Sequence, residues 1–178
     1  MPSGQPLAAL QRRHDGASSP SEQPKGLVES IIVSPLAGRI GPHCRESGCV
    51  WAIYRTPFLL PTSGNDRKPD VAFVSYQRRP QNRPLPRVNA WPVVPDLAVE
   101  VVGPTDEMFD VIEKVGEYFA AGVQQVWLIL SHVEQVFVFT GVTQVGVLTR
   151  AAALTADPLI PGFRMPLADL FPVSAPAP

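Results

Sequence analysis

The sequence predicts an α/β domain in which strands outnumber helices. Two nearly continuous apolar runs, Val71–Val74 and Leu97–Val102, are typical of strands that are covered on both faces. Between Thr105 and Gly122, apolar residues recur at the spacing of an amphipathic helix. The chain has 178 residues, of which 45% are hydrophobic, and this is enough to bury one core. We therefore expect one folded domain.

The first third of the chain divides into a tail and a series of predicted strands. Residues 1–25 are rich in Pro, Ser, Gln and Gly and lack apolar periodicity, so we expect them to be disordered. The folded domain is then expected over residues 26–172, with a second tail at 173–178. Three apolar segments are predicted as successive strands of one sheet: Leu27–Val33, which Ser34 and Pro35 stop, Val50–Tyr54, and Phe58–Leu60.

The middle of the chain contains two strands that begin in the same way. Pro69-Asp70 opens the first, Pro95-Asp96 opens the second, and Gly103-Pro104 ends the second. The helix that follows is expected to have Thr105 as its N-cap and to end at Gly122. Its predicted apolar stripe consists of Met108, Val111, Ile112, Val115 and Phe119.

The last third predicts an antiparallel meander and a closing segment. Val123–Leu130 and Val133–Phe139 are expected as strands joined by a tight turn at Ser131-His132, with Val145–Leu148 as a third strand. The segment Leu159–Phe171 is expected to pack back on the core.

One carboxylate stands inside a strand that is otherwise apolar. Burying an ionised group costs several kcal/mol unless it is paired or binds a metal, so Glu100 needs a partner. Asp70, at the start of the neighbouring strand, could share a divalent cation with Glu100, and Lys114 could reach the same site from the helix. The alternative is that Glu100 pairs with Lys114 or an arginine, and that Asp70 is a turn residue. Asp96 is a second-tier candidate. About 13 Å of extended chain separates it from Glu100, which is too far for the two carboxylates to share one ion.

The charge of the chain indicates where nucleic acid could bind. A formal net charge of −1 provides no general attraction to phosphate, so binding would need a local basic patch. The loop between the two Pro-Asp strands supplies four arginines that could form this patch. An equal alternative is that the loop is solvated and that its arginines serve solubility. These residues are Arg78, Arg79, Arg83 and Arg87.

Several other classes of protein are disfavoured by the sequence. It contains no P-loop, no G-x-S-x-G elbow, no G-x-G-x-x-G and no H-E-x-x-H motif. The N-terminus lacks the apolar h-region of a signal peptide, and there is no uninterrupted apolar run of about 18 residues or more. We therefore expect a cytoplasmic protein without a membrane partner.

Three segments of the chain together resemble the Uma-two family of putative restriction endonucleases in order and spacing. The segments are Pro69–Val74, Pro95–Pro104, and the run from Asp110 through Lys114, Tyr118 and Gly122-Val123 to Val126-Trp127-Leu128. Pro161–Phe171 also resembles the closing segment of that family, so about two thirds of the chain is covered. The resemblance implies a restriction-endonuclease-like fold, with a mixed central sheet and flanking helices.

The resemblance also implies an activity and a site of the PD-(D/E)XK type. Asp70 and Glu100 would bind Mg²⁺ or Mn²⁺, and Lys114, on the following helix, would take the place of the lysine that the pattern expects two positions after the acid. The implied enzyme is an endodeoxyribonuclease that hydrolyses DNA, and a homodimer is one open arrangement. Family members carry a full helix after the first Ser-Pro, whereas Leu36–Gly48 contains Gly38, Gly41 and Pro42 and is expected to be a poor helix. A catalytically degenerate nucleic-acid or protein-binding module is therefore the alternative function.

Overall fold

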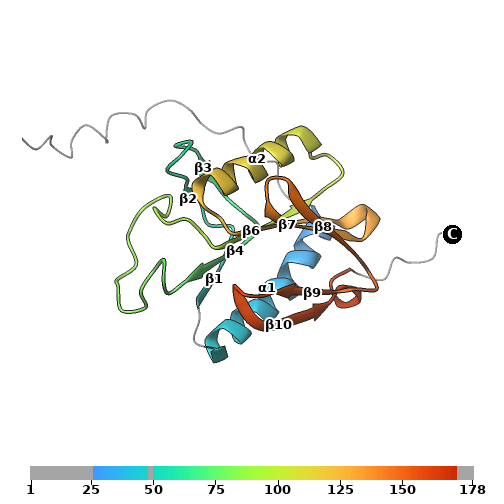
Figure 1. Ribbon diagram of the computed structural model, residues 1–178, viewed down its shortest axis with the longest axis horizontal. Helices are drawn as coiled ribbons and strands as arrows, with labels where there is room; N and C mark the ends of the chain where they lie inside the picture. The colour runs from blue at the N-terminus through green and yellow to red at the C-terminus, as the bar shows by residue number, and fades with distance from the viewer. Residues whose placement is uncertain (1–25, 48–49, 172–178) are drawn as a thin grey trace, which may run out of the picture.

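A mixed sheet of six strands forms the centre of the protein in the computed structural model, which describes residues 26–47 and 50–171. The strand order is β1-β4-β5-β6-β7-β8, and β5–β6 is the parallel pair within it. Helix α2 lies on one side of this sheet, and helix α1 lies on the other side with the β9–β10 pair (Figure 1). This architecture confirms the predicted mixed α/β fold. The predicted tails, 1–25 and 173–178, lie outside the described residues.

The elements follow one another along the chain with short connections, apart from the loop between β4 and β5. Their bounds are α1 Leu27–Ser47, β1 Val50–Tyr54, β2 Phe58–Leu59, β3 Asp66–Arg67, β4 Val71–Ser75, β5 Leu97–Val102, α2 Met108–Ala121, β6 Gln125–Leu130, a 3-10 turn Ser131–Val133, β7 Gln135–Gly141, β8 Gln144–Thr149, β9 Ala153–Ala156, β10 Ile160–Pro166, and a 3-10 turn Leu167–Asp169.

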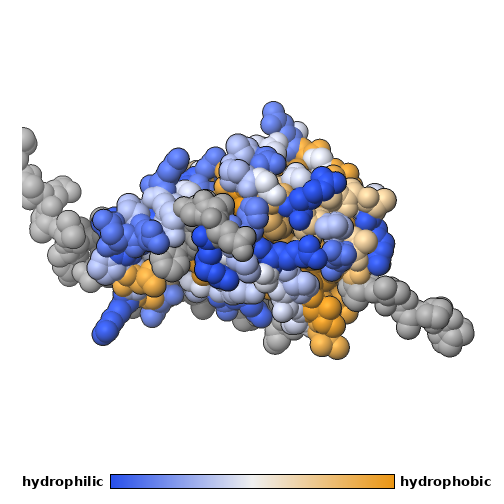
Figure 2. All heavy atoms as spheres, turned by 90° about the horizontal axis from the view of Figure 1, so that it is seen from below, coloured by the Kyte–Doolittle hydropathy of each residue, from blue (hydrophilic) through white to orange (hydrophobic). Residues whose placement is uncertain are grey.

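The two faces of the sheet carry separate hydrophobic clusters. On the α1 face, residues of α1, β9 and β10 pack against β4, β5 and β6, and Trp127 stacks on Phe163 with ring centroids 6.3 Å apart. On the α2 face, the buried helix residues Val111, Val115 and Tyr118 pack against β5, β6 and β7. Seen from the α1 side, the surface is mostly hydrophilic, with its larger hydrophobic areas at the end where the described chain stops (Figure 2). Both faces of β5 are therefore covered, as its apolar sequence predicts.

The prediction of a strand at Leu27–Val33 is wrong, because these residues form the first turns of α1. The helix continues to Ser47 through Pro35 and Pro42, so the expectation of a poor helix over Leu36–Gly48 is also wrong for its described part. Its buried residues recur with a helical period and are Ile32, Val33, Leu36, Ala37, Ile40 and Cys44. Burial of this stripe against the sheet outweighs the weak helix propensity of the β-branched residues and the bonds lost at proline.

Three smaller predictions are corrected in the same way. Phe58 and Leu59 form β2, which pairs with β3 in a separate sheet and not with β1. Helix α2 begins at Met108, with Glu107 in place of Thr105 as its N-cap, because Pro104–Asp106 form a turn. The buried face of α2 contains Tyr118, while Met108 and Ile112 of the predicted stripe are exposed.

Two further predictions for this half of the chain are confirmed, the end of α2 at Gly122 and the meander. The predicted tight turn at Ser131-His132 is instead a 3-10 turn at Ser131–Val133. Gly122 ends α2 with a φ of 97°, a left-handed conformation that glycine adopts without strain. The predicted meander is present as β6, β7 and β8. No helix among the described residues is long and apolar enough to cross a membrane.

The small β2–β3 sheet is bound to α2 by a charged contact. Arg67 of β3 donates from Nε to a carboxylate oxygen of Glu117 on α2 at 2.5 Å, and Asn65 donates to the other oxygen at 2.9 Å. The hydrogen bond from Arg67 is the main cause that lowers the pKa of Glu117, and the bond from Asn65 adds to it. The Thr62 hydroxyl also donates to the Ala120 carbonyl at 3.0 Å. Helix α2 is thereby fixed from the side on which β3 leads into β4.

The Arg67–Glu117 contact should make the stability of the fold depend on pH. The pKa of Glu117 is lower in the folded protein than its ordinary value of 4.5, so the contact stabilises the fold above that value and is lost as the pH falls further. Replacing Glu117 by Gln should lower the free energy of unfolding by about 1–3 kcal/mol near neutral pH. Urea denaturation should show the gap between wild type and variant closing below about pH 4.

The exposed Glu113 on the same helix provides the control, since Glu113→Gln makes the same chemical change at a carboxylate that acts on Arg67 through its charge and not through the short contact that Glu117 makes. Its effect on stability should be small at all pH values. A gap for Glu117→Gln that stays constant down to about pH 3 would show that the contact is not the source of the pH dependence.

Candidate active site

Asp70 and Glu100 lie at adjoining positions of two antiparallel strands. Val71 of β4 is paired with Val99 of β5, and the same register extended by one residue sets Asp70 opposite Glu100. Both side chains are buried, with exposed fractions of 2% and 5%. The Val101 backbone N–H donates to Asp70 Oδ2 at 2.8 Å, so the Asp70 carboxylate lies against the peptide that follows Glu100. The structure therefore sets the two predicted acids at neighbouring backbone positions of β4 and β5.

The Glu100 side chain faces helix α2. The hydroxyl of Tyr118 donates to Glu100 Oε1 at 2.7 Å, and Tyr118 itself is fully buried. A hydrogen bond from a neutral hydroxyl to a buried carboxylate is charge-assisted and fixes the orientation of the carboxylate. Tyr118 was not among the residues that the sequence singled out for chemistry. Its position seven residues after Val111, on the face that the helical period buries, was the available signal.

Lys114 lies on α2 one turn before Tyr118 and is half-buried. Its ammonium adds to the hydrogen bonds from Arg67 and Asn65 in lowering the pKa of Glu117, so Lys114 lies on the flank of α2 that faces β3. Asp70 follows β3 by three residues. Asp70 is bound by the Val101 amide and Glu100 by the Tyr118 hydroxyl. The convergence of Asp70, Glu100 and Lys114 on one pocket stays a prediction.

A third buried acid, Glu29, lies at the same end of the sheet and was missed by the sequence analysis. It has an exposed fraction of 6% and comes from α1. A Cβ atom at Gly103 would be 2.8 Å from Glu29 Oε1, so the glycine after β5 makes room for this carboxylate. The signal was present in the sequence, because Glu29 interrupts the apolar run Leu27–Val33 as Glu100 interrupts β5.

Glu29 and Asp70 also line a small hollow of about 160 Å³ on the surface. The other residues of its lining come from α1 and from the end of β1, and they are Ser30, Val33, Ser34, Tyr54 and Arg55. Glu100 and Lys114 are not part of this lining. Glu29 and Asp70 therefore face the hollow on the α1 side, whereas Glu100 faces helix α2.

Asp96, the second-tier candidate, lies at the opposite end of β5, where its hydrogen bonds hold the fold together. Its carboxylate accepts hydrogen bonds from the Ser75 N–H at 2.6 Å, from Arg78 Nε at 2.7 Å and from Gln124 Nε2 at 2.7 Å. Ser75 ends β4, and Gln124 precedes β6. The buried Asp96 thus joins the ends of three neighbouring strands and also compensates the charge of Arg78.

The four arginines of the β4–β5 loop divide into two pairs. Arg78 is bound by Asp96 and donates to the Gly122 carbonyl at 2.6 Å. Arg79 is buried, donates to the Arg83 and Pro84 carbonyls, and lies 6.0 Å from the Trp91 ring. Arg83 and Arg87 are exposed. Arg78 therefore joins the loop to Asp96 and to the end of α2, and Arg79 binds the backbone of the loop itself. Phosphate contact by the four arginines stays a prediction.

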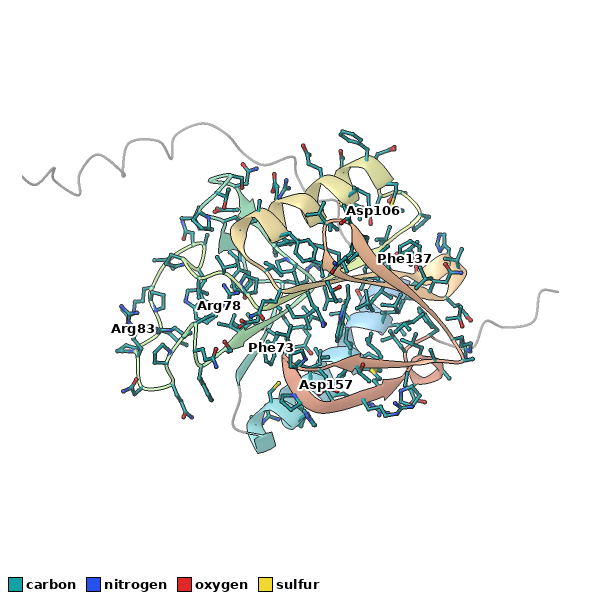
Figure 3. The ribbon with its side chains drawn as sticks, viewed as in Figure 1. Phe73, Arg78, Arg83, Asp106, Phe137 and Asp157 are labelled. Carbon is teal, nitrogen blue, oxygen red and sulfur yellow. The ribbon has the colours of Figure 1, made fainter. Side chains whose placement is uncertain are left out.

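The loop is attached at the end of β4 away from the acids. Five residues of extended chain between Asp70 and Ser75 correspond to about 17 Å. Figure 3 shows Arg78 and Arg83 on one side of the molecule and Asp106, whose carboxylate binds the Gly103 N–H at 2.7 Å, on the other. The arginines are thus not beside Asp70 at the point where the loop leaves the sheet.

Asp70 and Glu100 have the donor chemistry for a hard divalent cation. Among residues 26–47 and 50–171, no group of three or more His, Cys, Asp or Glu side chains could hold a metal ion. Mg²⁺ is usually held by one or two carboxylates, with water and substrate phosphate oxygens as the remaining ligands. Two carboxylates on adjoining strand positions fit a site of that kind.

The contacts of Asp96 lead to a prediction that separates it from the acids. Replacing Asp96 by Ala would leave the Ser75 amide and the Arg78 guanidinium without their buried partner, so the free energy of unfolding should fall by about 3 kcal/mol. Urea denaturation would measure this loss. Any nuclease activity per folded molecule should be retained by Asp96→Asn, and an Asp96→Asn protein of normal stability that has lost activity would contradict the structural role.

Comparison with known proteins identifies the family. The model of the Uma2 family, described as "Putative restriction endonuclease", matches residues 11–168. The fold is similar to the crystal structure of a putative nuclease belonging to DUF820 from Anabaena variabilis ATCC 29413. The TM-score is 0.72 at 20% identity, and the match covers 83% of this chain and 82% of that one. No curated protein matches the chain. Because the family model spans most of the sequence, the chain belongs to the Uma2 family of putative restriction endonucleases.

Proposed function

We propose that the protein is a metal-dependent endonuclease that hydrolyses phosphodiester bonds of DNA at a site formed by Asp70, Glu100 and Lys114. Membership of the Uma2 family and the nuclease-like fold support a nuclease. The observation that carries the proposal is the pair of buried acids at adjoining positions of β4 and β5. Burying two carboxylates at neighbouring strand positions is costly, and a cation bound by both would offset that cost.

In this proposal Asp70 and Glu100 hold Mg²⁺ or Mn²⁺. When it is bound, the ion supplies an activated water molecule and offsets the negative charge of the phosphate. The protein keeps both carboxylates oriented, since the Val101 N–H binds Asp70 and the Tyr118 hydroxyl binds Glu100. A carboxylate that is held in place before binding does not lose further conformational entropy when it accepts the ion.

Lys114 contributes positive charge from the helix. Lys114 is half-buried on α2, and its long stem would let the ammonium extend toward the phosphate. There it would orient the attacking water or stabilise the charge that develops on the phosphorus oxygens. The Arg67–Glu117 contact serves this role indirectly, because it fixes the helix that carries both Lys114 and Tyr118.

A catalytically degenerate binding module is the second candidate. The observation that favours it is that Glu100 and Asp70 already have protein hydrogen-bond partners, which compensate part of the cost of burying them without a metal. A binding module would retain affinity for nucleic acid or protein but would not depend on Mg²⁺. Cleavage assays therefore separate the two candidates.

The proposal predicts that Glu100→Gln abolishes Mg²⁺-dependent cleavage of DNA while the fold is kept. The amide oxygen can still accept the hydrogen bond from Tyr118, but the charge that binds the ion is gone. Cleavage of plasmid and linear DNA with Mg²⁺ or Mn²⁺ should fall by at least about 10²-fold, with an unchanged circular dichroism spectrum. Glu113→Gln, on the exposed face of α2, is the matched control and should cleave as wild type does.

Lys114→Ala should reduce the cleavage rate by about 10²-fold and leave the affinity for Mn²⁺ nearly unchanged, because the ammonium acts on the phosphate and not on the ion. The rate is measured under single-turnover conditions, and the affinity by calorimetry. If wild type cleaves no nucleic acid with either ion, and calorimetry finds no Mn²⁺ binding that Glu100→Gln removes, the nuclease proposal fails and the binding-module function replaces it.

A further inference from the structure

The hollow on the α1 side of Asp70 carries one cationic side chain, Arg55, directly after the end of β1. The Arg55 N–H donates to the Asp70 carbonyl at 3.3 Å, so the backbone beside one candidate catalytic acid is tied to the backbone of Arg55. Tyr54 and Arg55 both line the hollow together with Asp70. The end of β1 therefore lies next to the candidate active site, although no sequence pattern pointed to it.

The backbone of Arg55 is in a conformation that its side chain disfavours. Its φ is 38°, which lies in the left-handed region that glycine and asparagine adopt most easily. A bulky residue there carries a strain of about 1 kcal/mol or more, and such strain is often found at functional sites. Glycine or asparagine would relieve the strain, so the guanidinium itself is the property that an arginine adds at this position.

The charge of Arg55 is available to a ligand. Its side chain is exposed and makes no hydrogen bond or ion pair with the residues that the structure describes. The neighbouring acids Glu29 and Asp70 would repel a phosphate that approached the hollow, and a cation is needed to offset that repulsion. A guanidinium presents two parallel N–H donors that match two oxygens of one phosphate.

The hollow also offers an aromatic surface. Tyr54 is 48% exposed, and on β1 its position is paired with Val71, one residue after Asp70. Proteins that hold single-stranded nucleic acid combine a positive charge for the backbone with an aromatic ring for an unstacked base. A base inside a duplex has both faces covered by its neighbours and cannot stack on such a ring.

We propose that the hollow beside Asp70 is a nucleotide-binding subsite for a single strand, in which Arg55 binds a backbone phosphate and Tyr54 stacks on a base. This inference rests on the proposed nuclease function for its biological meaning and adds a substrate class to it. The strand would then lie against Asp70, which lines the same hollow. The hydroxyl of Ser34, which is exposed in the same lining, is within the subsite as a further polar group.

The test is the binding of a fluorescently labelled oligodeoxynucleotide, measured by anisotropy with the divalent ions removed by chelation. Wild type should bind the single strand more tightly than a duplex of the same sequence. Arg55→Asn should weaken single-strand binding about tenfold and lower its salt slope by about 0.7, the value for one lost phosphate contact on a single strand. Tyr54→Leu should weaken binding about tenfold without changing the slope.

The variants are chosen so that folding does not obscure the result. Asparagine accepts a positive φ, so Arg55→Asn should keep or raise the melting temperature, and Arg55→Lys should restore part of the affinity through charge alone. Arg164→Asn removes an exposed arginine of β10 outside the hollow and should bind as wild type does. If wild type cleaves, and if Arg55→Asn and Tyr54→Leu bind and cleave as wild type does, the subsite is overturned and the nuclease function stands. Binding that depends on both residues, in a protein that never cleaves, would overturn the nuclease function and leave the subsite standing.

Discussion

The central constraint on this structure is the burial of two carboxylates at adjoining positions of antiparallel strands. Each of these carboxylates loses hydration on burial, and this cost needs compensation from polar partners. The protein supplies part of that compensation from both sides. The Val101 amide binds Asp70 within the sheet, and the Tyr118 hydroxyl binds Glu100 from the helix. The remaining charge is what a cation at the site would neutralise.

The positions of the neighbouring elements follow from that constraint. Helix α2 must keep Tyr118 within hydrogen-bonding distance of Glu100, and it is held at its N-terminal half by hydrophobic burial of Val111 and Val115. At its C-terminal half, the Arg67–Glu117 contact joins it to β3. At the opposite end of β5, Asp96 joins three strand ends through its own hydrogen bonds. Asp96 therefore stabilises the scaffold at that end of β5, whereas Asp70 and Glu100 lie at the end that we propose as the active site.

The sequence predicted the part of the fold in which local pattern and tertiary burial agree. The unit β5–α2–β6 followed from an apolar strand, a helical stripe and Gly122, and the resemblance to the Uma-two family rested on the same residues. Helix α1 did not follow, because its β-branched start and two prolines disfavour a helix until the sheet buries Ile32, Leu36 and Ile40. The burial of Glu29 depends on the same helix, and a strand at Leu27–Val33 does not predict it. Arg55 gave no signal, because its proximity to Asp70 depends on the pairing of β1 with β4.

The claim that Asp70 and Glu100 form one cation site is tested most directly by diffraction from crystals soaked in Mn²⁺. The anomalous scattering of manganese locates the ion without reference to any assay of activity. The account predicts a peak about 2.1 Å from one oxygen of Asp70 and one of Glu100, absent from crystals of Glu100→Gln. A map with no peak between the two carboxylates at saturating Mn²⁺, or with the same peak in the variant, would contradict it.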